Sequence, residues 1–160
     1  MRLISTIAEP KILSPAEVDD LAERLAEACP RMEAVLMYLH GAHARGTQGQ
    51  LSDLDLAVLL DQQAGRDGIG DGIGKRHLDL IAALQELCGR EDVDLVLLNR
   101  AGPIIKDRVV RHGRLIYARS EAERVRFEAG AIMAALDFQH FSRVYDDALF
   151  RQLREGRFLG

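Results

Sequence analysis

Along most of the chain, segments with apolar residues at helical spacing alternate with short apolar runs typical of strands. This pattern predicts a protein of mixed helices and strands. Ser14, Pro15 and Glu17 form a helix-start signature, and apolar residues then recur at helical spacing until Pro30 ends the element. The short apolar run over 34–39 predicts a buried strand.

The same alternation continues after residue 40. Residues 41–50 are small and polar and predict a loop that can hold a helical turn. Residues 62–74 contain five glycines and predict a flexible surface loop, with a ligand-covering loop as the alternative. Further strands are predicted over 54–60, 93–98 and, at a sheet edge, 115–117, and further helices over 78–88, 103–110 and 120–147.

The order of these elements predicts an α+β (α/β) fold: a small mixed β-sheet of about four strands, helices packed on one face and a long C-terminal helix. We expect a single domain over 1–150 and a C-terminal tail over 151–160. All five phenylalanines lie in the last stretch, and Phe138, Phe141 and Tyr145 form one helical stripe. The stripe packs on the domain's own sheet or forms a protein-binding face.

Composition narrows the class of protein. The chain of 160 residues is 48% hydrophobic and 29% charged, which is ordinary globular composition. Its net charge of −4 argues against a general nucleic-acid coat, so no direct nucleic-acid binding is expected. No apolar run approaches the ~20 residues of a membrane helix, and there are only two cysteines. We therefore expect a soluble, cytoplasmic protein with no membrane partner.

Candidate chemistry lies in four aspartates at the starts of two predicted strands. Asp53 and Asp55 face the same side of a strand, about 7 Å apart along the chain. Asp92 and Asp94 begin the next strand, and Asp94 is the better candidate because apolar residues surround it and its charge there is costly unless something binds it. Three such carboxylates suit two magnesium ions, or else are simply solvated strand ends.

A glycine turn beside these aspartates adds a family resemblance. Gly41-Ala42, ten further residues and then Asp53-Leu54-Asp55 resemble the Gly-Ser, ten residues, Asp-x-Asp signature of the DNA polymerase β-like nucleotidyltransferases. The stretch from Val93 to Asn99 and the segments after it are similar to the minimal nucleotidyltransferases of that superfamily. The resemblance covers most of residues 35–145.

This resemblance implies an antitoxin that neutralises a HEPN ribonuclease toxin by transferring AMP from ATP to a toxin tyrosine. It implies ATP as substrate, a two-ion Mg²⁺ site and a hetero-oligomer with the toxin, and the chain could also form a homodimer. Asp53, Asp55 and Asp94 would be the catalytic and metal-binding residues. The nucleotide would be held by Gly41, Ala42 and Arg45.

The chain departs from the family pattern at Ala42, where the family has serine. Losing a hydrogen bond to a charged group costs about 1.5–3 kcal/mol, so we expect a slower enzyme rather than none. The alternatives are an inactive antitoxin that acts by direct binding and a small-molecule nucleotidyltransferase. His40 is expected to fill an inward strand position and His43 to face solvent or phosphate.

Overall fold

The computed structural model describes residues 13–46, 53–61 and 72–154. The predicted segment 62–74 therefore lies outside the described residues except for its last part. The elements are α1 (Pro15–Ala28), a 3₁₀ turn η1 (Cys29–Met32), β1 (Ala34–His40), α2 (Gly41–Arg45), β2 (Leu54–Leu60), α3 (Gly72–Cys88), β3 (Val93–Leu97), α4 (Pro103–His112), β4 (Arg114–Ala118) and α5 (Glu121–Arg154).

The four strands form one mixed sheet in the order β3-β2-β1-β4, which confirms the predicted sheet and the predicted edge position of β4. β1 is antiparallel to both β2 and β4, and β2 is parallel to β3. A register shift between Ala34 and Leu36 turns both Val35 and Leu36 to the same face. Because β2 and β3 are parallel, the starts of the two strands lie side by side at one end of the sheet and their last residues lie side by side at the other.

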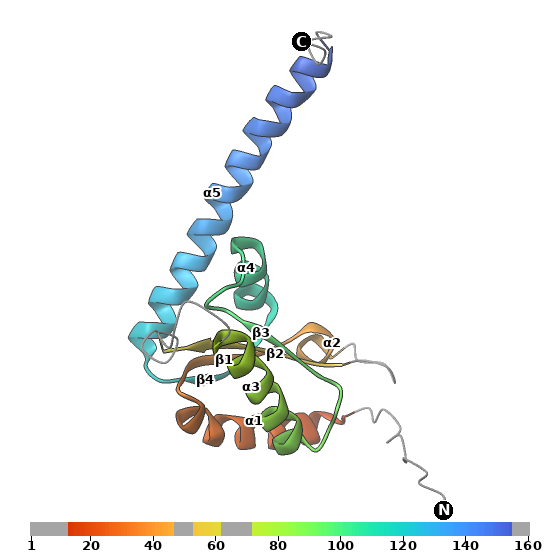
Figure 1. Ribbon diagram of the computed structural model, residues 1–160, viewed down its shortest axis with the longest axis vertical. Helices are drawn as coiled ribbons and strands as arrows, with labels where there is room; N and C mark the ends of the chain where they lie inside the picture. The colour runs from red at the N-terminus through yellow and green to blue at the C-terminus, as the bar shows by residue number, and fades with distance from the viewer. Residues whose placement is uncertain (1–12, 47–52, 62–71, 155–160) are drawn as a thin grey trace, which may run out of the picture.

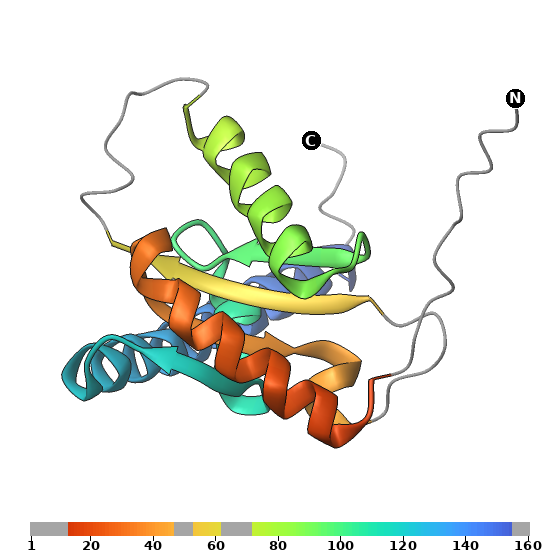
Figure 2. The same ribbon diagram turned by 90° about the horizontal axis from the view of Figure 1, so that it is seen from below.

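Helices cover both faces of the sheet (Figure 2). The larger core cluster joins α1 and α3 to one face, with Leu25 and Leu84 almost fully buried against β1, β2 and β3. The smaller cluster joins the opposite face to α4 through Val109 and to the start of α5 through Phe127. The prediction had helices on one face; α4 and α5 cover the second because Val35 and Tyr38 make it apolar too.

Local signals placed most helix ends correctly. Ser14 and Glu17 form the predicted capping box of α1, and the Ser120 hydroxyl accepts from the Glu123 backbone N–H at 3.3 Å at the start of α5. The prediction of a loop up to Gly74 is wrong at its end, because α3 already begins at Gly72. Glycine weakens a helix by only about 1 kcal/mol relative to alanine, and the buried face of α3 outweighs that cost.

The C-terminal helix α5 is the longest element, and its second half extends away from the sheet (Figure 1). It runs to Arg154, past the predicted helix end at residue 147. Phe127 packs against the smaller core cluster, whereas Phe141 of the predicted stripe is 68% exposed. Across residues 13–46, 53–61 and 72–154, no helix combines the length and apolarity needed to cross a membrane.

Candidate functional site

Strand register brings one acidic side chain from each of β2 and β3 into a row with a histidine of β1. Asp55 pairs with His40 across the antiparallel ladder and with Asp94 across the parallel ladder. Neighbouring strands lie about 4.8 Å apart, so the three side chains share one face and one end of the sheet. This is the face that α4 and α5 cover further along the strands.

The glycine turn after β1 lies directly against Asp55. Gly41 has φ +70°, a conformation that favours glycine, and a Cβ added there would lie 2.0 Å from Asp55 Oδ2. The backbone of the turn therefore approaches the carboxylate more closely than any other residue type allows. The structure thus places the glycine turn beside Asp55.

Asp55 is half-buried, and its pKa is raised above the ordinary value of 3.8. Burial is the main cause, and the carboxylates of Asp94 and Asp53 raise the pKa further, while His40 and His43 lower it. The three aspartates are thus close enough to influence one another electrostatically. Their mutual repulsion is an energetic cost that a bound cation would offset.

The structure separates Asp92 from Asp94. Both carboxylate oxygens of Asp92 accept hydrogen bonds from the Arg90 guanidinium, and these bonds lower the pKa of Asp92. Asp94 instead uses Oδ1 to accept from the backbone N–H of Leu95 at 3.0 Å and is exposed. The expectation that Asp94 would be surrounded by apolar residues is wrong, because β3 is an edge strand and this end of it is open.

The remaining predicted site residues flank this row. Asp53 directly precedes β2 and is exposed, and Ala42 is half-buried in the first turn of α2. Arg45 is the last residue of α2, and its side chain is exposed. The glycine turn thus leads straight into a one-turn helix, and α2 contacts both β1 and β2.

Of the two histidines, His43 differs from expectation and His40 does not. His43 is buried, at 5% exposure, rather than facing solvent, because α2 folds back over the sheet end and turns this side chain inward. His40 is half-buried as an inward strand residue. Neither His40 Nε2 nor His43 Nδ1 has a hydrogen-bond partner within the part of the chain that the structure describes. No local pattern indicates the burial of His43, since that burial depends on the tertiary position of α2.

The donor set fits magnesium in its chemistry. Carboxylate oxygens are the ligands that hard divalent cations prefer, and Asp53, Asp55 and Asp94 supply them from two adjacent strand starts. Among residues 13–46, 53–61 and 72–154, however, no three histidine, cysteine, aspartate or glutamate side chains are arranged to hold one ion. The two-ion magnesium site therefore stays a prediction.

Comparison with known proteins gives a family match. The family model described as polymerase beta, nucleotidyltransferase matches residues 23–122, which include the glycine turn and all three aspartates. The chain is 30% identical over 118 residues to the protein adenylyltransferase MntA of Shewanella oneidensis, covering 72% of this chain and 73% of that protein.

Solved structures resemble the fold. A toxin–antitoxin crystal structure with AMP-PNP superposes with a TM-score of 0.62 at 24% identity, covering 81% of this chain and 98% of that one. A tri-AMPylated Shewanella oneidensis HEPN toxin in complex with an MNT antitoxin gives a TM-score of 0.59 at 20% identity, covering 82% and 98%. At these identities the likeness shows the fold alone.

Proposed function

Because this chain belongs to the polymerase β nucleotidyltransferase family, we propose that it is the antitoxin of a toxin–antitoxin pair and transfers AMP from ATP to a tyrosine of a HEPN toxin. The observation that carries this proposal is the row of Asp55 and Asp94, with Asp53 beside it and the Gly41 backbone against Asp55. The adenylyltransferase relative and the toxin complexes of similar fold supply the substrate class.

The proposed reaction joins the toxin tyrosine oxygen to the α-phosphorus of ATP and releases pyrophosphate. Asp94, which is exposed, would accept the tyrosine proton. Asp53, Asp55 and Asp94 would hold magnesium, which when bound neutralises triphosphate charge. Backbone N–H groups at Gly41 and Ala42 would bind the β- and γ-phosphates. Arg45 would add positive charge beside them, so that the site acts through positioning and electrostatics.

Ala42 changes the expected rate rather than the expected chemistry. It keeps a backbone N–H but has no hydroxyl, so one hydrogen bond to a charged oxygen is lost, worth about 1.5–3 kcal/mol. That corresponds to roughly ten- to a hundredfold in rate. The second candidate function, an antitoxin that acts only by binding the toxin, is favoured by this one residue.

We propose that the toxin docks on the second half of α5. The helix face that carries Phe127, which packs against the smaller core cluster, and the buried Ala131 continues, at the same spacing, as Phe138, Phe141 and Tyr145. The last three are 50%, 68% and 62% exposed. Exposed aromatic side chains in a row are typical of protein interfaces.

The α5 surface can be tested apart from the chemistry. Replacing Phe141 and Tyr145 together by serine should weaken toxin binding at least about tenfold, as expected for aromatic anchors. Leu136→Ser is the matched control, because Leu136 is 55% exposed on the opposite side of the same helix. Equal binding by the double variant and the control would exclude this surface.

The catalytic proposal is tested by co-purifying the chain with its candidate toxin, adding ATP and magnesium, and measuring the intact mass of the toxin. Wild-type chain should add AMP units, and Asp53→Ala with Asp55→Ala should abolish the gain. Asp79→Ala with Glu86→Ala is the charge-matched control, because both side chains are exposed on α3 and lie outside the site.

The two candidate functions give different results. A mass gain that the control keeps and the aspartate variant loses supports transfer. A toxin that stays unmodified but is bound and inhibited equally by wild-type chain and aspartate variant would reject the catalytic proposal and leave a binding antitoxin.

A further inference from the structure

A second site lies at the far end of the same sheet face. A cavity of about 950 Å³ opens where β2 and β3 end, between the start of α4 and the first half of α5. Its wall includes Leu60, five residues beyond Asp55 along β2, which places it about 17 Å from that carboxylate. None of the aspartates proposed for catalysis lines it.

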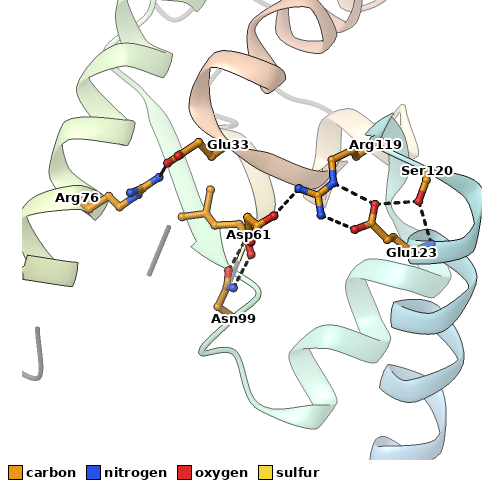
Figure 3. A network of polar contacts seen from close by, with 8 residues as sticks. Glu33, Asp61, Arg76, Asn99, Arg119, Ser120 and Glu123 are labelled. Atoms are coloured by element: carbon orange, nitrogen blue, oxygen red, sulfur yellow. Dashed lines mark hydrogen bonds and ion pairs between the residues drawn. The ribbon is translucent and has the colours of Figure 1, made fainter. Parts of the chain in front are cut away.

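The cavity is built around a polar network (Figure 3). The Asn99 side chain both accepts from the Leu60 backbone N–H at 2.9 Å and donates to the Leu60 carbonyl at 2.8 Å. Arg119 bridges Asp61 and Glu123, and therefore ties the end of β2 to the start of α5. These contacts connect Leu60, Asp61, Asn99 and Glu123 around the cavity. They pair only part of the positive charge that lines it.

The charge of the cavity is opposite to that of the whole chain. Five basic and two acidic side chains line it, although the chain carries a net charge of −4. Arg119 and Arg76 are paired with carboxylates. The side chains of Arg100, Lys106 and Arg126 make no hydrogen bond or ion pair with another residue of the described ranges, so three cations remain available to a ligand.

The floor between these cations is apolar. Val35, Leu98 and Phe127 belong to the smaller core cluster and also line the cavity. Gly130 and Ala134 add small residues from α5, which leave room above the floor. A basic rim over an apolar floor suits a ligand with an anionic group on an apolar body.

We propose that this cavity binds a small organic phosphate, with its phosphate held by Arg100, Lys106 and Arg126 and its apolar or aromatic body on the floor. This phosphate site depends neither on the aspartate site nor on the proposed antitoxin function. Arginine and lysine suit phosphate because they donate several charge-assisted hydrogen bonds, and the aromatic face of Phe127 suits a planar body.

The experiment is a calorimetric titration of the purified full chain with AMP in magnesium-free buffer containing EDTA. Replacing Arg100, Lys106 and Arg126 together by serine should weaken binding at least about tenfold, or about 1.4 kcal/mol. Replacing Arg31, Lys75 and Arg108 together by serine is the charge-matched control, because all three are exposed and none lines the cavity. Ribose 5-phosphate and adenosine should each bind more weakly than AMP, because the first lacks the aromatic base and the second lacks the phosphate.

Gly130 provides a test that leaves the charges unchanged. A Cβ added at Gly130 meets no atom within 4 Å, so Gly130→Ala should keep AMP binding while the larger Gly130→Leu should fill the cavity and abolish it. Both substitutions favour the helix over glycine, and their thermal unfolding reports that the fold is kept.

Three results would overturn the proposal. AMP that does not bind the wild-type chain would reject it, as would binding that survives in both the triple variant and Gly130→Leu. An acidic peptide that binds the rim cations while AMP does not would assign the surface to a protein partner instead.

Discussion

Gly41→Ala tests whether the glycine turn positions Asp55. The substitution has two separable effects. At φ +70° an alanine is strained by about 1–2 kcal/mol in the left-handed region. Its Cβ would also lie 2.0 Å from Asp55 Oδ2 and 2.8 Å from Cγ, distances that no real contact has, so the Asp55 side chain must rotate away. Leaving its rotamer costs a further ~0.5–1.5 kcal/mol.

Two other glycines of the chain isolate the first effect. Gly46 and Gly89 have φ +66° and +64°, and a Cβ at either meets nothing within 4 Å. Gly46→Ala and Gly89→Ala should therefore lose only the ~1–2 kcal/mol of backbone strain. Gly41→Ala should lose more in urea unfolding, and the difference measures the contact with Asp55.

Function should separate the variants more sharply than stability. A displacement of about 1 Å in a reacting group can cost about a hundredfold in rate, so Gly41→Ala should lose AMP transfer to the toxin by about that factor. Gly89 lies at the end of α3, so the Gly89→Ala variant should transfer AMP at the wild-type rate. Equal stability and equal transfer rates for Gly41→Ala and Gly89→Ala would refute the inference that the turn positions Asp55.

Three further predictions follow from single contacts. Ionised Asp55 destabilises the folded chain because its pKa is raised, so Asp55→Asn should raise the urea midpoint at pH 7 in magnesium-free buffer. That gain should shrink as the pH falls through the folded-state pKa towards 3.8, and added magnesium should stabilise only the wild-type chain. Tyr38→Phe should cost about 1.5–3 kcal/mol of unfolding free energy, because the buried Tyr38 hydroxyl donates to Glu128 Oε1 at 2.9 Å. Asn99→Ala should cost about 1–3 kcal/mol of unfolding free energy by leaving both backbone groups of Leu60 without their partner, and Asn99→Asp should not restore it, because its second carboxylate oxygen would face the Leu60 carbonyl; a wild-type unfolding midpoint for either variant would contradict this role.

Elements with a local signature could be predicted from the sequence. Capping boxes at Ser14 and Ser120 located two helix starts, and Gly89, at φ +64°, ended α3 as predicted. The start of α3 could not be predicted, because glycines at 72 and 74 read locally as a loop and only packing against the sheet makes them helical. Local rules fail where a tertiary contact outweighs propensity.

The candidate site, too, could be predicted from the sequence only in part. The spacing of Asp53 and Asp55 and the glycine at 41 were visible in the sequence, and the structure places Gly41 against Asp55 near the start of β2. The choice between Asp92 and Asp94 depended on Arg90, whose pairing with Asp92 has no periodic signal. The cavity could not be predicted from the sequence, since its basic residues come from α3, α4, α5 and two loops and are scattered between residues 76 and 126.

The parallel pairing of β2 and β3 explains why one small domain carries opposite charges at its two ends. Both strands start at carboxylates, Asp55 and Asp94, and both finish at the cavity, whose wall carries five basic and two acidic side chains. A magnesium-bound triphosphate and a free organic phosphate would thus bind about 17 Å apart along β2. Since substitutions that far apart without shared partners usually add within about 0.5 kcal/mol, Asp55→Asn and Gly130→Leu should be additive in unfolding free energy. Clear non-additivity would instead mean that the sheet couples the two ends.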